Sequence, residues 1–356
     1  MIINILLPGS ARYPIGGFKI IFEYANGLSV KGHKVNIILP LNINEMDDSL
    51  TVRIKWKYIY YRDKILKKFK ADSWFKFDSN INVHWVQSLD QKFIPEGDIL
   101  VATSWHTAQI ANEYSQNKGK KVYFIQSFET WHGSYEDVIA TWKMPFKKIV
   151  IANWLLEIAR KNNEEAKLIY NGFDFNSFGI DVLPQQRDPL SIGMLYHEME
   201  IKGSRFGLEA FEKLKTEYPE LEVNLFGVPE KSKHIPEWIN YFQNPDQNLL
   251  RKIYNNSSIF VNPSKVEGFA LTPAEAMICG CAVVVSDIAG HRDYSFNEKT
   301  ALLFTSENVD SLIEKLRILL NDNDKRINLA KKGNEYINKF QWQDSIDKFE
   351  KLILEI

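Results

Sequence analysis

Glu267 and Glu275 are two acidic residues separated by seven positions, in a segment that follows a predicted strand and enters a predicted helix. The strand is the apolar run Ile259–Asn262, so Glu267 and Gly268 lie in a turn beyond its carboxyl end. The first turn of the helix has backbone N–H groups without intrahelical partners, and such groups bind anions such as a diphosphate. Two carboxylates beside an anion site favour neutral ligands with many hydroxyl groups, such as a sugar and a ribose.

Glu275 also has a purely structural interpretation. Thr272 is a good N-cap residue, and Pro273 suits the first position of a helix. That assignment puts Glu275 where the acid of a capping box belongs. Both roles of Glu275 therefore stay open, whereas the position of Glu267 in the turn suggests no comparable structural role.

The block resembles the retaining family 4 glycosyltransferases of the GT-B class, whose acid-x7-acid spacing it shares. The resemblance covers Glu-Gly-Phe-Ala-Leu-Thr-Pro-Ala-Glu-Ala-Met and continues through Gly280, Val283–Ser286 and Gly290. It implies that Glu267 contacts the hydroxyls of the donor sugar and that Glu275 binds the nucleotide ribose. The donor would be held further by the segment Gly268, Phe269, Ala270, Leu271 and Thr272, whose backbone amides meet the diphosphate.

A cation is also expected to reach the diphosphate. The resemblance places an arginine shortly before a Lys-Gly pair, after the first strand of the second domain. Lys202-Gly203 matches the pair, but Met194 and His197 occupy the positions where the arginine is expected. We expect Lys202 to act on the phosphates and His197 to be a weaker substitute for the arginine, although Lys202 also fits a plain solvated surface charge.

Three predicted strand ends in the first half carry further candidates for substrate contact. Gly16 and Gly17 follow the first strand, and paired glycines permit close approach of the backbone to a ligand. His106 follows a second strand, and Gln126 and Glu129 follow a third. The Gln-Ser-Phe-Glu run resembles bacterial rhamnosyltransferase-like members of the family. Simpler alternatives are a common glycine loop and a buried structural histidine.

Short apolar, β-branched runs alternate with amphipathic stretches through most of the chain, which is typical of parallel sheets covered by helices. The predicted strands are Ile2–Leu7, Val35–Leu39, Ile99–Thr103, Val122–Gln126, Lys148–Ala152, Leu190–Leu195, Val223–Phe226, Ile259–Asn262 and Ala282–Ser286. The predicted helices are Phe18–Lys31, Thr107–Gln116, Gly207–Glu217 and Asn248–Asn255, with two more beginning at Asp310 and Trp342.

The pattern stops in a turn-rich stretch near Tyr170–Asp174 and then begins again. We therefore predict an α/β protein of the GT-B type, with two Rossmann-like domains facing across a cleft. The acceptor-side domain spans residues 1–172, and the nucleotide-sugar domain spans residues 173–335. A last helix, residues 336–356, is expected to return to the first domain.

Composition excludes several classes of protein. A formal net charge of −1 disfavours a globally basic nucleic-acid binder. The only cysteines, Cys279 and Cys281, form neither a disulfide framework nor a complete zinc site, which favours a reducing compartment. Asp322 and Asp324 spell an acid-x-acid pattern, but they stand between helices, so we expect a solvated turn. The first residues are expected to form a strand, and no run is long enough for a membrane span.

Residues 51–80 combine a local excess of positive charge with many aromatic rings. The basic residues are Arg53, Lys55, Lys57, Arg62, Lys64, Lys67, Lys68, Lys70 and Lys76, against only Asp63, Asp72 and Asp78. The aromatic residues are Trp56, Tyr58, Tyr60, Tyr61, Phe69, Trp74, Phe75 and Phe77. This mixture suits an anionic lipid surface, a nucleic-acid contact, or a plain helical hairpin with a solvated basic face.

The predicted activity is transfer of a sugar from a nucleotide-diphosphate sugar to an acceptor hydroxyl on a glycan or lipid-linked saccharide, with retention of configuration. The resemblance implies no metal and no cofactor beyond the donor itself. We expect a cytoplasmic protein, associated at most peripherally with the inner face of the membrane, and no nucleic-acid partner. The alternatives are a nucleotide-sugar epimerase of the same fold and a non-catalytic module that binds a nucleotide or a lipid surface.

Overall fold

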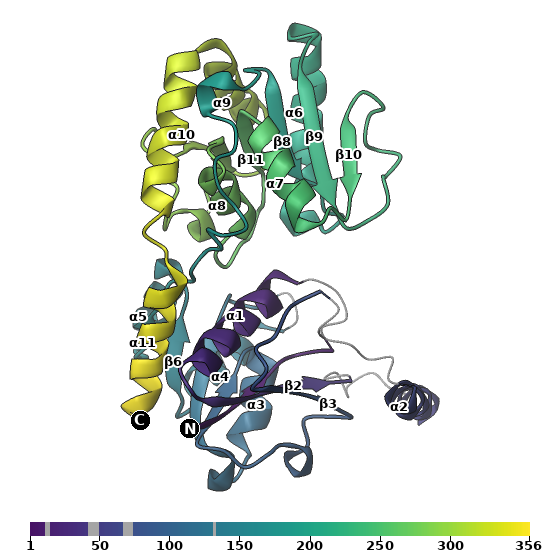
Figure 1. The fold of residues 1–356 in the computed structure, drawn as a ribbon, viewed down its shortest axis with the longest axis vertical. Helices are drawn as coiled ribbons and strands as arrows, with labels where there is room; N and C mark the ends of the chain where they lie inside the picture. The colour runs from purple at the N-terminus through teal and green to yellow at the C-terminus, as the bar shows by residue number, and fades with distance from the viewer. Residues whose placement is uncertain (11–14, 42–49, 67–73, 131–132) are drawn as a thin grey trace. The chain divides into compact units, whose positions relative to one another are not determined.

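The computed structural model describes residues 1–10, 15–41, 50–66, 74–130 and 133–356. They form two compact units (Figure 1). The first contains residues 1–171 and 342–356, and the second contains residues 172–341. The sequence places the boundaries after residues 172 and 335, whereas the chain changes unit after residues 171 and 341.

The first unit is built on a sheet of seven parallel strands in the order β3-β2-β1-β4-β5-β6-β7. The strands are β1 (Ile2–Leu6), β2 (Lys34–Pro40), β3 (Ile81–Val86), β4 (Ile99–Ala102), β5 (Lys120–Ile125), β6 (Lys147–Val150) and β7 (Lys167–Leu168). The order reverses between β1 and β4. In open α/β sheets, ligands bind beyond the carboxyl ends of the strands at such a reversal.

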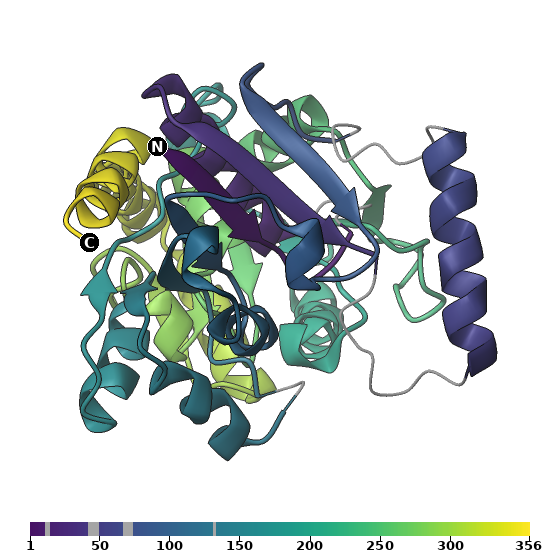
Figure 2. The ribbon, with the colours of Figure 1, turned by 90° about the horizontal axis from the view of Figure 1, so that it is seen from below.

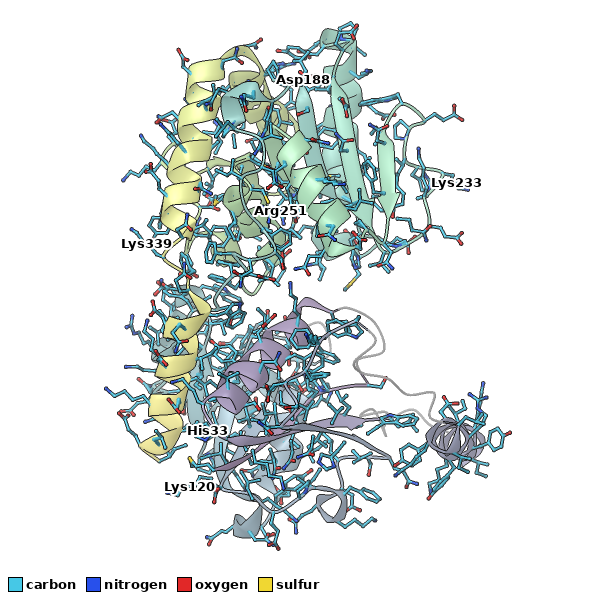
Figure 3. The ribbon with its side chains drawn as sticks, in the orientation of Figure 1. His33, Lys120, Asp188, Lys233, Arg251 and Lys339 are labelled. Carbon is cyan, nitrogen blue, oxygen red and sulfur yellow. The ribbon has the colours of Figure 1, made fainter. Side chains whose placement is uncertain are left out.

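The helices of the first unit connect these strands, and one helix comes from the far end of the chain. They are α1 (Gly16–Val30), α2 (Leu50–Ile65), α3 (Trp105–Asn112), α4 (Tyr135–Trp142), α5 (Asn153–Lys161) and α11 (Trp342–Leu354). Helix α11 packs on α1 through the Tyr24 ring, whose centroid lies 5.3 Å from that of Trp342 and 5.2 Å from that of Phe349. His33 lies just beyond α1, where Figure 3 labels it. Its Nε2 atom lies 2.9 Å from Glu350 Oε1.

The second unit has six parallel strands in the order β10-β9-β8-β11-β12-β13. The strands are β8 (Ser191–Leu195), β9 (Glu222–Gly227), β10 (Asn240–Gln243), β11 (Ile259–Asn262), β12 (Ala282–Ser286) and β13 (Leu302–Phe304). The helices are α6 (Ser204–Glu217), α7 (Gln247–Asn256), α8 (Leu271–Ile278), α9 (Val309–Asn321) and α10 (Asn323–Ile337). Here the strand order reverses between β8 and β11.

The structure confirms all nine predicted strands to within about two residues at each end. The sequence patterns did not predict β3, β7, β10 and β13, or helices α4 and α5. Strand β3 carries exposed residues on an edge of its sheet, so it lacks the continuous apolar run of a central strand. Helix α3 begins at Trp105 rather than Thr107, because Ser104 and Thr107 form a capping box there.

No helix in the described parts of the chain combines the length and the apolar character needed to cross a bilayer.

Candidate functional site

Lys202 and Glu267 lie at the point where the strand order of the second sheet reverses. Lys202 ends a 3-10 turn, Glu200–Lys202, shortly after β8, and Glu267 stands in the loop after β11. These two strands are neighbours in the sheet. Their carboxyl ends therefore bring residues 65 positions apart in sequence to one place, where open α/β sheets bind ligands.

The Lys202 ammonium binds both carboxylate oxygens of Glu267. Its Nζ atom lies 2.8 Å from Oε1 and 3.0 Å from Oε2. The Ser264 hydroxyl donates a third hydrogen bond, of 2.7 Å, to Oε1. The side chains of Lys202 and Glu267 are 26% and 14% exposed, so the pair is sheltered and still reachable from solvent. The carboxylate is thus fixed in orientation by charge-assisted hydrogen bonds.

Two glycines allow the backbone segments of this site to approach one another. Gly203 has a φ of +65°, and a Cβ atom there would lie 2.0 Å from the Pro263 carbonyl oxygen. A Cβ atom on Gly290 would lie 2.2 Å from the Glu267 carbonyl oxygen. Any larger residue at either position would push the turn of Lys202 or the loop of Glu267 out of place. The glycine of the predicted Lys-Gly pair therefore has a steric reason to be there.

The predicted cap of helix α8 is wrong. The helix begins at Leu271, so Ala270 is the N-cap residue and makes no side-chain cap hydrogen bond. Thr272 lies inside the first turn, and its hydroxyl accepts a hydrogen bond of 3.3 Å from Asn262 Nδ2. Leu271 is already helical, and Ala270 before it has the extended backbone of an N-cap residue, so the helix starts two residues earlier than predicted. The first turn therefore keeps its backbone N–H groups for another acceptor.

The same shift removes the capping-box role of Glu275. Glu275 lies in the second turn of α8, too far along for its carboxylate to reach back to the N-cap. Its Oε2 atom instead accepts a hydrogen bond of 2.9 Å from the hydroxyl of Tyr254, a fully buried residue of α7. The buried Tyr254 hydroxyl thus orients the Glu275 carboxylate from the protein interior. Of the two roles that the sequence leaves open for Glu275, the structural cap is excluded.

Neither residue considered as a replacement for the arginine supplies a positive charge. Met194 lies on β8, is fully buried and packs beside Gly207 of α6. His197 is half-buried, and burial lowers the pKa of its imidazole, with the nearby Lys202 lowering it further. Its Nδ1 atom accepts a hydrogen bond of 3.0 Å from the Met199 N–H, which suits a neutral ring. Lys202 is thus the one cation among the predicted residues of this site.

In the first unit, the candidates gather where its sheet reverses, beyond β1, β4 and β5. Gly16 and Gly17 begin α1, and a Cβ atom on Gly17 would lie 3.5 Å from the side-chain oxygen of Gln126. His106 lies in the first turn of α3, with its ring 3.8 Å from that of Trp105. The rest of the glycine loop, residues 11–14, lies outside the described residues.

Glu129 joins this group through the start of α3. Its carboxylate accepts a hydrogen bond of 3.0 Å from the Trp105 N–H at the helix N-terminus. Burial raises the pKa of Glu129 to about 7, against an ordinary value of 4.5, and this hydrogen bond opposes the rise. The carboxyl group is therefore part protonated at neutral pH. A partly protonated carboxyl group beside a helix N-terminus can accept a hydrogen bond from a ligand hydroxyl or donate one to it.

Ser264 and Tyr254 are the site residues that sequence reasoning missed. Ser264 stands three positions before Glu267, and its hydroxyl could have been recognised as a local partner in the same loop. Tyr254 stands on a different helix, 21 positions before Glu275. Only the packing of α7 against β11 and α8 brings its hydroxyl to that carboxylate, and no local sequence pattern encodes it.

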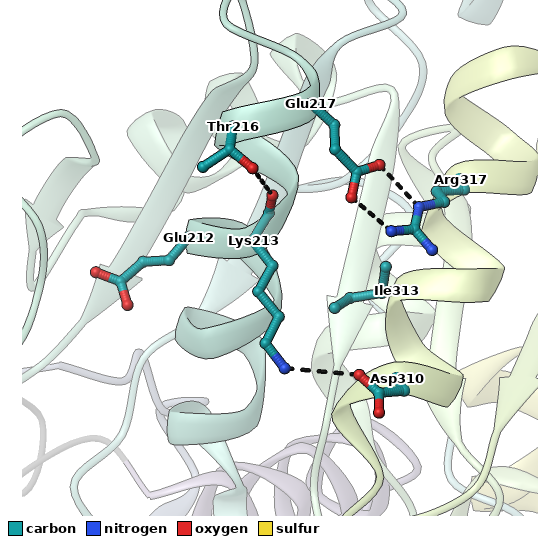
Figure 4. Close-up of a pocket in the computed structure, with 7 residues that line it drawn as sticks. All are labelled: Glu212, Lys213, Thr216, Glu217, Asp310, Ile313 and Arg317. Carbon is teal, nitrogen blue, oxygen red and sulfur yellow. Dashed lines mark hydrogen bonds and ion pairs between the residues drawn. The ribbon is translucent and has the colours of Figure 1, made fainter.

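A cavity of about 580 Å³ lies elsewhere in the second unit, between α6 and α9 (Figure 4). It is lined by Glu212, Lys213, Thr216, Glu217, Asp310, Ile313 and Arg317. Four of the five charged side chains pair with one another, Arg317 with Glu217 and Lys213 with Asp310. None of the predicted site residues lines it, and we assign it no function.

Asp322 has a structural role rather than a place in a metal site. Its carboxylate caps α10 by accepting a hydrogen bond of 2.9 Å from the Lys325 N–H. Within the described residues, no three His, Cys, Asp or Glu side chains come together as metal ligands.

Comparison with known proteins finds glycosyltransferases. Residues 184–336, which include most of the second unit, match the family model "Glycosyl transferases group 1". A Campylobacter jejuni N,N'-diacetylbacillosaminyl-diphospho-undecaprenol α-1,3-N-acetylgalactosaminyltransferase is 41% identical over 80 residues, or 22% of this chain and 21% of its own length. A capsular polysaccharide biosynthesis glycosyltransferase of Staphylococcus aureus is 24% identical over 226 residues, or 58% of each chain.

Solved structures match over the whole chain. Anabaena HepE in complex with UDP and glucose superposes with a TM-score of 0.75 at 14% identity, covering 100% of both chains. Sucrose-phosphate synthase from Thermosynechococcus elongatus gives a TM-score of 0.73 at 14% identity, covering 99% of this chain and 98% of that one. With the two parallel sheets, these matches confirm the predicted GT-B fold.

Proposed function

We propose that this chain, whose residues 184–336 match the family model of the group 1 glycosyl transferases, moves a sugar from a nucleotide-diphosphate sugar to an acceptor hydroxyl. The observation that carries the proposal is the Glu267 carboxylate, held in a fixed orientation at the reversal of the second sheet. An oriented carboxylate beside an uncapped helix start suits a ligand that joins polar hydroxyls to a diphosphate. A nucleotide sugar is such a ligand.

The ion pair between Lys202 and Glu267 suggests how the donor is received. Before the donor binds, each charge neutralises the other across 2.8 Å. An incoming diphosphate offers Lys202 a second anion, while the sugar hydroxyls offer Glu267 neutral hydrogen-bond donors. We propose that Lys202 then shares its ammonium with the diphosphate and that Glu267 keeps Ser264 and gains the sugar. The negative charge that grows on the leaving diphosphate would be stabilised by Lys202 and the first turn of α8.

Retention of configuration and the lack of a metal requirement belong to the same proposal. The acceptor would attack from the face that the diphosphate leaves, and the diphosphate would help to remove the acceptor proton. Lys202 and the helix start would supply the positive field that a divalent cation supplies in other phosphate sites. Support for both points comes from the family resemblance of the block Glu267–Glu275. Transfer that survives an excess of EDTA and gives a product with the donor's anomeric configuration would agree with them.

The donor and the acceptor are proposed by class. The HepE complexes contain UDP, so a UDP-sugar is the first donor to test. The two curated relatives act, by their descriptions, on an undecaprenol-linked saccharide and in capsule synthesis, and the matched segments span 21% and 58% of their lengths. We therefore propose a glycan or lipid-linked saccharide acceptor and a place at the cytoplasmic face of a membrane. The rhamnosyltransferase-like character of the Gln126 run stays a prediction.

The test compares three isosteric variants of this chain. A melting-temperature screen with UDP, GDP, ADP and dTDP first identifies the base, because a ligand at 100 times its Kd stabilises the folded state by about 2.7 kcal/mol. Glu267→Gln should then lower transfer by about 100-fold or more while the nucleotide still binds. Glu275→Gln should weaken nucleotide binding. Glu335→Gln, on the exposed face of α10, is the control that changes neither.

Three results would contradict the proposal. Full transfer activity of a well-folded Glu267→Gln protein would remove Glu267 from the reaction. Interconversion of the donor sugar without transfer to any acceptor would identify an epimerase instead. Binding of a nucleotide with neither reaction would leave a non-catalytic module.

A further inference from the structure

Helix α2 exposes a continuous apolar stripe along one face. Ile54, Tyr58, Tyr61 and Ile65 follow one another at spacings of four, three and four residues, which aligns side chains on one side of a helix. Their exposed fractions are 60%, 66%, 54% and 78%. Large apolar side chains that are this exposed, and contiguous along a helix, mark an interaction surface rather than ordinary protein surface.

The opposite face of α2 is anchored to the first unit, which fixes the direction of the stripe. The Tyr60 side chain is buried, its ring centroid lies 4.8 Å from that of Trp85 on β3, and its hydroxyl donates to the Trp85 carbonyl oxygen at 3.2 Å. Asp63 is also buried and pairs with Arg62 at 2.7 Å. Because Tyr60 and Asp63 face the protein, the stripe faces away from it.

Positive charges border the stripe on both sides. Counting 100° for each residue, Lys57 and Lys64 fall on one border and Lys55 and Arg62 on the other. All four side chains are exposed, and the single acidic residue between positions 54 and 66 is the buried Asp63. An apolar stripe between two rows of cations is the arrangement of a helix that lies in the plane of an anionic lipid surface.

The rest of the basic and aromatic segment does not share this surface. Trp74, Phe75 and Phe77 surround Phe22 of α1, with ring centroids 5.4, 5.2 and 4.8 Å away. These three aromatic residues therefore belong to the packing of the first unit. Residues 67–73 of the segment lie outside the described residues. The strongly exposed apolar and aromatic side chains in the described part of the segment therefore lie on α2, which Figure 2 draws lengthwise, or directly after it at Leu66.

We propose that α2 docks this protein on an anionic lipid bilayer, with the stripe Ile54, Tyr58, Tyr61 and Ile65 in the headgroup region. Lys55, Lys57, Arg62 and Lys64 would meet the lipid phosphates, and the tyrosine hydroxyls would stay at the wet boundary. A second copy of the chain fits the surface poorly, because an isologous contact brings two sets of cations together. A nucleic acid would meet the cations but leave the central isoleucines without a partner.

The inference is independent of the donor site. Helix α2 lies in the first unit and outside residues 184–336, which match the family model. Vesicle binding requires neither donor nor acceptor, so it can fail or succeed whatever the outcome of the transfer assays.

The test is co-sedimentation of the full chain with phosphatidylcholine vesicles, made with and without phosphatidylglycerol. The wild type should bind only the anionic vesicles. Binding should weaken as salt is raised from about 0.1 M to about 1 M, because the Debye length falls from ~10 Å to ~3 Å. Tyr58→Ser with Ile65→Ser should reduce binding by about tenfold or more. Lys55→Gln with Lys57→Gln should reduce it by about fivefold for each cation removed. Lys64 is kept because its Nζ donates a hydrogen bond of 3.0 Å to the hydroxyl of Tyr60.

Matched controls replace side chains of the same kinds at positions outside α2. Val30 at the end of α1 is 78% exposed, so Val30→Ser removes an equally exposed apolar side chain and should leave binding unchanged. Lys331→Gln with Lys332→Gln removes two exposed charges of α10 and should also leave it unchanged. Every variant should keep the wild-type melting temperature, since all the replaced side chains are exposed.

Four results would overturn the proposal. Wild-type protein that ignores anionic vesicles, or α2 variants that bind them like the wild type, would remove the lipid surface as the partner. Equal binding to neutral and anionic vesicles would remove the role of the cations. A wild-type dimer in light scattering that the Tyr58→Ser, Ile65→Ser protein loses, without vesicle binding, would identify the stripe as a contact between copies.

Discussion

Glu267 and Glu275 have the same side chain but different neighbours, and the neighbours decide how each can meet a ligand. Glu267 is bound by a cation and a serine hydroxyl in a loop. Glu275 is bound from below by the hydroxyl of the buried Tyr254. A carboxylate paired with a cation can exchange that cation for a ligand, whereas a carboxylate oriented by a buried tyrosine keeps that partner when a ligand binds.

Ser264 is predicted to position Glu267 rather than to support the fold. Ser264→Ala removes the 2.7 Å hydrogen bond to Oε1 and leaves the bonds from Lys202. We expect kcat to fall by about tenfold, corresponding to ~1.4 kcal/mol, with an unchanged KM for the donor. Steady-state kinetics measure the effect, and Thr216→Ala on the exposed side of α6 is the control. An unchanged kcat in the Ser264 variant would contradict the positioning role.

Glu129 is predicted to make stability depend on pH. Its pKa is about 7 in the folded chain and has the ordinary value of 4.5 in the unfolded chain. Between these two values the unfolded chain has released the proton while the folded chain keeps it, so stability falls as pH rises and levels off above about 7. Glu129→Gln has no ionisable group at this position, so it should not lose stability in this way as pH rises.

Thermal melts of the wild type and of Glu129→Gln at several pH values measure that effect. The melting temperature of the variant should match the wild type near pH 4.5 and exceed it increasingly up to about pH 7. A difference that does not change with pH would show that the Glu129 carboxyl titrates normally in the folded protein.

The sequence indicated which residues lie near the reversal of the second sheet more fully than it indicated the contacts between them. Glu267, Lys202 and Glu275 could be named because their spacing to strand ends and glycines is local. The ion pair between Lys202 and Glu267 joins residues 65 positions apart, and it follows only from β8 and β11 being neighbours in the sheet. The prediction that Thr272 is the N-cap residue of α8 was wrong because capping depends on where the helix begins. Ala270, which has no capping side chain, is the N-cap residue.

At the scale of elements, the turn after β8 and the loop after β11 depend on each other through Gly203. Gly203→Ala adds a methyl group where the Pro263 carbonyl oxygen already lies 2.0 Å away, in a backbone conformation that itself costs ~1–2 kcal/mol for an L-residue. We expect a loss of about 3 kcal/mol or more in unfolding free energy, together with loss of donor binding. Chemical denaturation and nucleotide titration measure the two effects.

Gly32 offers a matched control for that variant. It also has a positive φ, of +90°, but a Cβ atom there would meet nothing within 4 Å. Gly32→Ala should therefore lose only the ~1–2 kcal/mol of backbone strain and keep donor binding. Equal effects of the two variants would show that the contact with Pro263 has no importance of its own.

The elements that could be predicted are those whose burial is visible in their own pattern of apolar and polar residues. Central strands such as β1, β4 and β11 are buried on both faces, so they appear as apolar runs. Strand β7 has two residues and β13 has three, too few for any periodicity. The stripe on α2 was hidden for another reason: only the burial of Tyr60 and Asp63 shows which of the interleaved aromatic and basic residues face outward.

At the scale of the whole molecule, the second unit is continuous in sequence and the first is not. Residues 172–341 form the second unit, whereas the first needs α11 from beyond it. A fragment of residues 172–341 is therefore expected to fold alone and to bind the nucleotide like the full chain. Calorimetry and nucleotide titration of that fragment measure both properties. Failure of the fragment to fold would show that the first unit supports it.

A fragment of residues 1–171 is expected to be far less stable than the same residues in the full chain. It lacks Trp342 and Phe349, which cover the buried ring of Tyr24, and the pair of Lys31 with Glu350 at 2.7 Å. Gly27 makes the fit close, because a Cβ atom there would lie 2.1 Å from Ile346. Adding a peptide of residues 342–356 should raise the melting temperature of the fragment. No effect of the peptide would contradict the role of α11.

The position of α11 also sets an order of events during synthesis. The ribosome makes residues 1–171 first, but the surface around Tyr24 stays uncovered until residues 342–356 have emerged, after the whole of the second unit. The first unit, whose strands are synthesised before the second unit, is thus completed only after the second unit. A chain that is truncated before residue 342 therefore has a first unit that exposes apolar surface, which chaperones and proteases recognise.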